Sequence, residues 1–274
     1  MQSLTDIRNL LEARGLKPLK QFGQNFLHDQ NQIHRLIEAA GVGPGDLVLE
    51  IGPGTGALTE ALLDAGAEVV ACEIDMGLSD LVAERFEDRV QLVRGDCLET
   101  GRRLSRNVVE ALGDKPWSLV ANLPYQVASP IMIDLLMHHP NCHGQYVTIQ
   151  KEVADRLLSS PGNKTRGPLG ILASTFGSIE RIGVIPATCF WPQPKVVSAM
   201  VALMPLELEQ EIDRQAFARF VTMLFSARRK QLGRILGRDR ELPGGIDPSW
   251  RPDVLTNEQL MALFNQEEGP RRLS

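Results

Sequence analysis

The sequence predicts an α/β fold, a doubly wound and mostly parallel sheet, followed by a small all-helical domain. Short apolar runs alternate with helix-length segments between residues 46 and 150, and the first run leads into a glycine-rich turn. Beyond residue 213, apolar residues recur at helical spacing. The 274 residues, 43% of them apolar, are enough for a packed core and exclude a disordered chain.

Five apolar runs are the predicted strands of the parallel sheet. Each is short and apolar at successive positions, as strands buried on both faces are. The segments between them are long enough for crossover helices. The runs are LVLEI (47–51), EVVAC (68–72), VQLV (90–93), SLVAN (118–122) and QYVTIQ (145–150). A further strand is predicted at 195–203.

The N-terminal residues are expected to form two short helices around an irregular loop. Thr5 is predicted to cap a first helix that ends near Gly15. Asp29 is predicted to cap a second helix that ends near Gly41. These segments make up an N-terminal cap at residues 1–45.

The C-terminal region follows an acidic connector at 206–213. Its apolar residues have helical spacing, and Thr256 with Gln259 forms a predicted capping box. We therefore expect two domains, one at residues 1–205 that includes the N-terminal cap and a helical one at 206–274.

The first predicted strand ends in a glycine turn, Glu50-Ile-Gly-Pro-Gly-Thr-Gly56, which favours close approach of the backbone to a ligand. Glu73 ends the second strand, about 20 residues further on, as in dinucleotide-binding proteins. A carboxylate there can accept both hydroxyls of an adenosine ribose, in NAD or in S-adenosylmethionine. The alternative is a turn that only packs a helix against the sheet.

Residues at the ends of two later strands distinguish NAD from S-adenosylmethionine as the expected cofactor. Asp96 ends the third strand, where its carboxylate can accept an adenine amino group. The fourth strand ends in Asn-Leu-Pro-Tyr (122–125), a motif typical of amino-methyltransferases that has no role in hydride transfer. A lone tetrapeptide of this kind is more often a strand-end turn with its aromatic in the core. After a glycine turn and two acidic strand ends it favours S-adenosylmethionine, and the sequence resembles the class I methyltransferases that use this cofactor.

Eight motifs in register resemble the ribosomal RNA adenine dimethyltransferase family, and its small-subunit branch in particular. The likeness covers residues 15 to 265 approximately. The motifs are GQNFLHD (23–29), EIGPGTGALT (50–59), EID (73–75), GD (95–96), NLPYQVASP (122–130), QKEVADRL (150–157), FWPQPKVVSA (190–199) and FSARRKQL (225–232).

The resemblance implies a class I, Rossmann-like methyltransferase sheet that binds S-adenosylmethionine. It further implies N6,N6-dimethylation of two adjacent adenosines in a hairpin loop near the 3′ end of small-subunit rRNA, within an immature 30S subunit. A cytoplasmic monomer with no membrane or metal requirement is expected. The alternatives are the large-subunit branch linked to antibiotic resistance and an assembly factor of the same fold that methylates little.

The resemblance also assigns roles to residues by position. The cofactor residues that it implies are Asn25, Leu27, Gly52, Glu73, Asp96 and Asn122. Asn122 Oδ1 and the Leu123 carbonyl would accept the two N–H bonds of the target amine, on a turn shaped by Pro124. Tyr125 would stack on the adenine and Phe190 would cover its other face, although Phe190 could instead belong to the core.

The charge of the chain is unevenly distributed. A net charge of −5 argues against a nucleic-acid partner. Residues 214–240, however, contain eight basic residues and one acidic residue, a local charge of +7. Within it, Arg228, Arg229, Lys230 and Arg234 are the predicted RNA-binding residues. A solvated helical face paired with the acidic connector is the alternative.

Other features predict no additional chemistry. HHPNCH (138–143) crowds four candidate metal ligands into six positions, so a polar connecting loop is expected instead of a metal site. The four cysteines form no CxxC pair and are expected to be reduced thiols that fill space. Gln126 and Arg166 depart from the family pattern, which leaves the details of RNA docking open.

Overall fold

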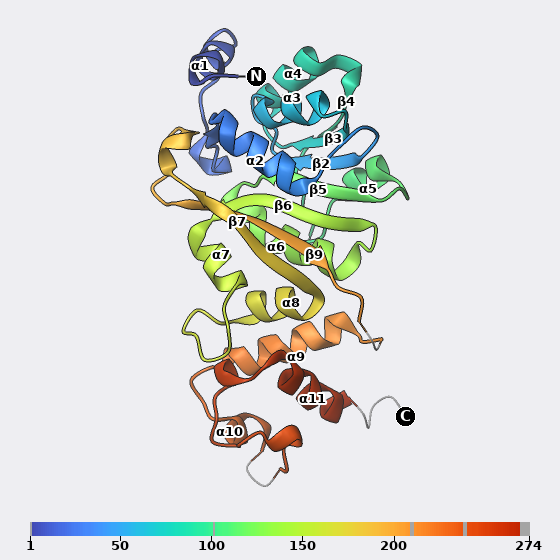
Figure 1. The fold of residues 1–274 in the computed structure, drawn as a ribbon, viewed down its shortest axis with the longest axis vertical. Helices are drawn as coiled ribbons and strands as arrows, with labels where there is room; N and C mark the ends of the chain where they lie inside the picture. Colours follow the sequence, from blue (N-terminus) through green and yellow to red (C-terminus); the bar gives the residue numbers. More distant parts are fainter. Residues whose placement is uncertain (1, 101, 209–210, 238–239, 269–274) are drawn as a thin grey trace. The chain divides into compact units, whose positions relative to one another are not determined.

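The computed structural model describes residues 2–100, 102–208, 211–237 and 240–268 (Figure 1). The chain divides into two compact units. The first contains residues 1–154 and 178–205, and the second contains residues 155–177 and 206–274. The sheet lies in the first unit with the helices that cover it, and the C-terminal helices lie in the second.

The first unit is built on a seven-stranded sheet with the order β4-β3-β2-β5-β6-β9-β7. Strands β2 to β6 are parallel, and the five predicted strands are confirmed. Strand β9 is antiparallel to β6, so the sheet is mixed at one edge. The strands are β2 (Leu47–Ile51), β3 (Glu68–Glu73), β4 (Val90–Arg94), β5 (Trp117–Asn122), β6 (Cys142–Gln150), β7 (Gly177–Ile185) and β9 (Ser198–Pro205).

The antiparallel edge is the part that the sequence predicts least well. Strand β9 begins at Ser198 and not at residue 195, because Lys195, Val196 and Val197 form an exposed segment before it. Strand β7 is not predicted. Its sequence, GSIERIGVI, has a mostly polar centre, since an edge strand leaves much of its length in solvent.

Helices cover the sheet, and α2 and α3 contact each other on one of its faces (Figure 1). Asp29 caps α2 through the Gln32 N–H, and Gly41 ends the helix at a φ of 62°, as predicted. An apolar cluster joins these helices to the central strands. The helices are α2 (Gln30–Ala40), α3 (Ala57–Asp64), α4 (Met76–Phe86), α5 (Arg106–Leu112), α6 (Tyr125–His138) and α7 (Lys151–Leu157), with short 3₁₀ turns at η2 (Glu87–Arg89) and η3 (Ala187–Cys189).

The N-terminal segment begins with α1 (Leu4–Glu12), which is capped by Ser3. The prediction of Thr5 as the cap is wrong, because Ser3 and Asp6 form the capping box. The chain then continues through η1 (Lys20–Phe22) to β1 (Phe26–Leu27), which pairs antiparallel with β8 (Phe190–Trp191). This small sheet ties the N-terminal loop to the segment that precedes β9.

The second unit is helical, with an aromatic core. The rings of Phe176 and Phe264 both meet Phe217 edge to face, at centroid distances of 5.7 and 5.4 Å. Thr256 and Gln259 form the predicted capping box. The elements are α8 (Pro168–Phe176), α9 (Arg214–Ser226), α10 (Leu232–Leu236), η4 (Pro243–Gly245), η5 (Pro252–Val254) and α11 (Asn257–Glu268).

The division of the chain differs from the predicted one at residues 155–177. This segment clusters with the C-terminal helices and not with the sheet. The Leu206 N–H donates to the Phe176 carbonyl at 2.9 Å, and the Phe176 ring packs on Phe217. Helix α8 is therefore part of the core of the second unit although it precedes β7 in the sequence.

Candidate active site

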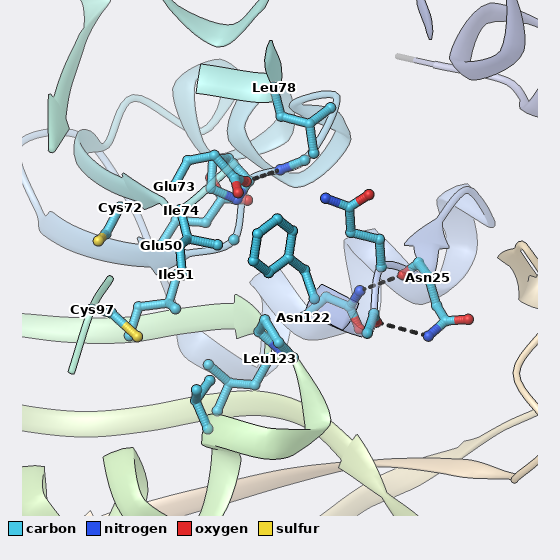
Figure 2. Close-up of a pocket in the computed structure, with 18 of the residues that line it drawn as sticks. Asn25, Glu50, Ile51, Cys72, Glu73, Ile74, Leu78, Cys97, Asn122 and Leu123 are labelled. Carbon is cyan, nitrogen blue, oxygen red and sulfur yellow. Dashed lines mark hydrogen bonds between the residues drawn. The ribbon is translucent and has the colours of Figure 1, made fainter. Parts of the chain in front are cut away.

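A cavity of about 300 Å³ opens at the carboxyl ends of the parallel strands in the first unit (Figure 2). This edge is where open α/β sheets bind ligands. Its walls are the loop before β1, the glycine turn after β2, and the ends of β3, β4 and β5. The cavity brings together the predicted site residues Asn25, Leu27, Gly52, Glu73, Asp96, Asn122, Leu123, Pro124 and Tyr125.

The two glycines of the turn that line the cavity cannot be replaced without strain. Gly52 has a φ of 72°, and a Cβ there would lie 3.3 Å from Pro124 Cγ. Gly54 has a φ of 60°, and its Cβ would lie 2.8 Å from the Phe26 ring. Other residues are strained at such φ values. At Gly52 and Gly54 the turn presents only backbone atoms to the cavity, between the N-terminal loop and the end of β5; we call this segment the glycine cradle.

The carboxylate of Glu73 is buried beside this turn. The Gly54 N–H donates to Oε2 at 3.2 Å, and the Asp75 N–H donates to Oε1 at 2.9 Å. Burial raises the pKa of Glu73, and these two donors oppose that effect. A carboxylate offers about four lone-pair sites, so about two remain for the hydroxyls of a ligand.

Asp96 and two cysteines line the cavity beyond β3 and β4. Asp96 is exposed, and its Oδ1 accepts the Leu98 N–H at 2.9 Å. Burial raises the pKa of Cys72 to about 12 and also raises that of Cys97. Both side chains are therefore neutral thiols at physiological pH, which suits packing and not nucleophilic chemistry.

Asn122, at the end of β5, is oriented by the N-terminal loop (Figure 2). Its Nδ2 donates to the Asn25 backbone carbonyl at 3.0 Å. The Asn25 side chain is held in turn, because its Nδ2 donates to the Gly23 carbonyl at 2.9 Å. With its amino group engaged, the Asn122 amide has its oxygen free to serve as an acceptor.

The rest of the NLPY motif turns the chain from β5 into α6. The Leu123 N–H donates to the Thr148 carbonyl on β6 at 3.1 Å, and the Leu123 side chain is buried. Pro124 is the N-cap residue of α6, with a φ of −56°. Tyr125 begins the helix, and its hydroxyl lies 2.8 Å from Ser198 Oγ.

Phe190 is the one predicted site residue of the first unit that is not found among the described residues lining the cavity. It is 3% exposed, pairs with Leu27 between β8 and β1, and belongs to the apolar cluster that joins α2 and α3 to the central strands. The geometry therefore favours core packing for Phe190. Its neighbour Trp191 stacks on Phe26 at a centroid distance of 6.3 Å.

Several polar residues of the cavity lie outside the predicted set, among them Glu50 and Gln24. Glu50 is 2% exposed at the end of β2 and accepts the Thr59 hydroxyl at 2.6 Å. Burial raises its pKa to about 8, and the nearby Glu73 charge adds to the rise. The sequence signal that could have identified Glu50 as a cavity residue is its position as the first residue of the glycine motif.

Gln24 is another such residue, and it fastens the N-terminal loop to the start of α4. Its Nε2 donates to Asp75 Oδ2 at 2.9 Å, and its Oε1 accepts the Leu19 N–H at 2.7 Å. Asp75 in turn donates its N–H to Glu73. The loop is thus attached to Asn122 at one side and to the Glu73 region at the other.

The predicted RNA-binding residues lie in the second unit. The chain leaves α9 at Ser226, so Arg228, Arg229 and Lys230 lie in the turn between α9 and α10. Arg228 donates to the Asn163 carbonyl at 3.3 Å and to Asp253 at 3.4 Å. Arg229, Lys230 and Arg234 are exposed, whereas two charged residues counted in the basic segment, 238 and 239, lie outside the described residues.

Arg166 has a structural position. It is 2% exposed and donates to the carbonyls of Ser159 and Leu255, at 3.1 and 3.0 Å, and to Asn257 Oδ1 at 2.9 Å. Burial lowers its pKa, and the charge of Glu258 opposes that effect. Arg166, where the sequence departs from the family pattern, therefore links the 159–166 loop to the start of α11 through buried hydrogen bonds.

The HHPNCH segment spans the end of α6 and the start of β6. His139 Nε2 lies 3.2 Å from Asp134, and Cys142 is buried. Within the described residues, no group of three or more His, Cys, Asp or Glu side chains is placed to hold a metal ion. None of the described helices has the length and apolar character that crossing a bilayer requires.

Comparison with known proteins identifies the family. The family model described as "Ribosomal RNA adenine dimethylase" matches residues 15–257. The chain belongs to this family. The eight motifs of the sequence and the cavity described above thus lie in an adenine dimethylase, and the predicted fold class and enzyme class are confirmed.

Relatives match the dimethylase over nearly its whole length. A protein of Rhodococcus opacus named "Ribosomal RNA small subunit methyltransferase A" is 39% identical, covering 91% of this chain and 89% of its own. A protein of the same name from Nocardia farcinica is 37% identical, over 95% of this chain and 94% of its own. A solved dimethyladenosine transferase from Plasmodium falciparum has the same fold, with a TM-score of 0.75, 24% identity and coverage of 90% and 98%.

Proposed function

We propose that the protein is a small-subunit rRNA adenine dimethyltransferase that transfers methyl groups from S-adenosylmethionine. Its targets would be the N6 amines of two adjacent adenosines in a hairpin loop near the 3′ end of the RNA, within an immature 30S subunit. Family membership supports the adenine chemistry, and the names of the relatives support the small-subunit target. The large-subunit branch remains the competing enzyme.

The observation that carries this proposal is the orientation of Asn122. Its amino group is committed to the Asn25 carbonyl, which leaves the amide oxygen as an acceptor at the cavity. The exocyclic amine of adenine is a poor nucleophile, because its lone pair is delocalised into the ring. Acceptors aimed at its N–H bonds, here Asn122 Oδ1 with the Leu123 carbonyl, favour the localised lone pair that develops during attack.

The chemistry of the cavity fits S-adenosylmethionine. The glycine cradle has no side chains at the positions where a Cβ would clash with Pro124 and Phe26. Glu73 retains acceptor capacity for ribose hydroxyls, and Asp96 offers a carboxylate to an adenine amino group. When bound, the cofactor supplies an electrophilic methyl group on a sulfonium. Asn25, Leu27 and Gly52 complete the set of residues proposed to hold it.

The protein residues contribute mainly positioning. A sulfonium leaves as a neutral thioether, so the reaction requires no base of unusual pKa. Tyr125 offers an aromatic face for the adenine, worth about 1–3 kcal/mol by analogy with other base-stacking sites. The target adenine must be unpaired or flipped for its amine to reach Asn122. Much of the rate enhancement then comes from holding amine and methyl group in line.

Methyl transfer is tested with labelled S-adenosylmethionine and undermethylated small subunits, followed by mapping of the modified nucleosides. We expect label in N6,N6-dimethyladenosine of the small-subunit RNA. The Asn122→Ala variant should lose transfer by at least a hundredfold while still binding RNA. Asn107→Ala, which changes an exposed asparagine on α5, is the matched control and should retain full activity.

The alternatives give different results in the same experiment. Label confined to large-subunit RNA would replace the small-subunit assignment by the competing branch. Binding of small subunits without label in either RNA would support the assembly factor that methylates little. Asn122→Ala with undiminished transfer would contradict the role given to the amide oxygen, whichever RNA is modified.

RNA binding by the second unit is proposed for the exposed basic residues Arg229, Lys230 and Arg234. Replacing Arg229 and Lys230 by alanine should weaken RNA binding and reduce its salt dependence by about one logarithmic unit per lost phosphate contact. Replacing Arg106 and Lys115, exposed residues of the first unit, removes the same charge and serves as the control. Equal losses for the two pairs would indicate a general charge effect and refute a specific patch.

A further inference from the structure

Tyr125 is hydrogen-bonded to Ser198, which belongs to the FWPQPKVVSA motif but is not among the predicted site residues. Its hydroxyl lies 2.8 Å from Ser198 Oγ, and either oxygen can donate. Ser198 is 0% exposed, whereas Tyr125 is half-buried at the cavity wall. A buried hydroxyl is nearly always hydrogen-bonded, so loss of this contact would be costly for both partners.

The position of Ser198 in the sheet is well defined. It is the first residue of β9 and pairs with Gln150 at the end of β6. On the other side of β6, Thr148 pairs with Asn122 and accepts the Leu123 N–H. The serine is therefore fixed to the strand that also fixes the NLPY turn.

A tyrosine on the first turn of a helix has two side-chain torsions, and the first sets the direction in which the ring extends. The hydroxyl oxygen lies on the axis of the second torsion, so a hydrogen bond to it holds this direction and leaves the ring plane to the packing around it. Because the hydroxyl is at the edge of the ring, the bond does not occupy a face on which a base could stack. The Ser198 contact is a bond of this kind, made to the first residue of β9.

We propose that Ser198 is a positioning residue for methyl transfer, which acts through the Tyr125 hydroxyl to hold the ring in the place where the target adenine stacks. The inference rests on the proposed function of the same cavity. It requires that the effect of Ser198 disappears when the Tyr125 hydroxyl is absent. It also requires that cofactor affinity is unaffected, because the contact lies on the side of Tyr125 and not at Glu73 or Asp96.

The first test is spectroscopic and does not depend on activity. The chain has two tyrosines, Tyr125 and Tyr146, so protein labelled with 3-fluorotyrosine gives two ¹⁹F signals, which Tyr146→Phe assigns. Ionised Tyr125 can only accept, and Ser198 is then its donor. The bond lowers the pKa of Tyr125 against the effect of burial, so Ser198→Ala should raise that pKa and shift or broaden the Tyr125 signal alone.

The second test is a kinetic cycle with Ser198→Ala, Tyr125→Phe and the double variant. Each single variant should lower kcat about three- to tenfold, the size expected for one hydrogen bond, with the Kd for S-adenosylmethionine unchanged. The double variant should be no slower than either single one. Tyr125→Phe removes the same hydrogen bond, so its kcat still tests the contribution of the bond if Ser198→Ala folds poorly.

The outcomes separate this inference from the proposed function. Additive losses in the double variant, or an unchanged Tyr125 signal in Ser198→Ala, would overturn the role of Ser198 even in an active dimethyltransferase. Wild-type protein that methylates neither ribosomal RNA would overturn the proposed function, and the kinetic role of Ser198 with it. In that case a shifted Tyr125 signal would still establish the contact.

Discussion

Glu50 should make the stability of the first unit depend on pH. The side chain is 2% exposed, and burial raises its pKa from 4.5 to about 8. The folded protein therefore keeps a proton that the unfolded chain releases between these two values. Its contribution to stability is complete below pH 4.5 and is lost as the pH rises through about 8.

The size of the effect follows from proton linkage. One proton of difference lowers the free energy of unfolding by about 1.4 kcal/mol per pH unit. Between pH 5 and pH 7.5 the loss should be about 3 kcal/mol for Glu50, whose full burial removes solvent screening. Glu50→Gln has no proton to lose and can still accept the Thr59 hydroxyl through its amide oxygen.

The assay is urea denaturation at a series of pH values, followed by tryptophan fluorescence. In a Trp250→Phe background the remaining tryptophans, Trp117 and Trp191, both belong to the first unit. Relative to its parent, Glu50→Gln should gain stability steadily up to about pH 8 and then level off. Glu12→Gln, at an exposed position of α1, is the control. Parallel stability curves for Glu50→Gln and its parent would refute the argument.

Three further changes have defined outcomes. Arg166→Met should lower the free energy of unfolding of the second unit by about 2–4 kcal/mol, since it leaves buried carbonyl groups without donors, as denaturation would show. Gln24→Ala should weaken S-adenosylmethionine binding about three- to tenfold in calorimetry, because it frees the loop from Asp75 and Leu19; unchanged affinity would contradict the fastening role. Gly54→Ala should weaken the same binding more, at least tenfold, because its Cβ would lie 2.8 Å from the Phe26 ring at a left-handed φ; a protein that binds normally would contradict the cradle.

The site residues at strand ends could be predicted because topology places them. Glu73, Asp96 and Asn122 each follow an apolar run, and parallel strands end at one edge of a sheet. The structure adds the contacts that orient them, such as the bond from Asn122 to the Asn25 carbonyl. A bond to a backbone carbonyl has no signature in the sequence, because every residue has one.

The parts that could not be predicted depend on long-range packing. Phe190 and Trp191 are adjacent aromatics, and only the pairing of β8 with β1 determines which one is buried. Strand β7 has a polar centre, so its pattern is that of a surface segment. Arg166 is a charged residue in a loop sequence, but its guanidinium is buried because the start of α11 supplies its acceptors from 89 and 91 residues away.

The basic segment illustrates how contacts change the meaning of a charge count. Of its described residues, Arg228 meets Asp253 at 3.4 Å and Arg240 pairs with Glu267 at 2.5 Å, so part of the local positive charge is neutralised within the second unit. Its exposed basic residues are Arg219, Arg229, Lys230 and Arg234. Since phosphate contacts require accessible charge, this described part of the segment should contribute at most about four contacts to RNA binding. The described residues therefore add a salt dependence of about four contacts and not the seven that a count of their basic residues predicts. A measured contribution of about six would mean that Arg228 and Arg240 exchange their carboxylates for RNA.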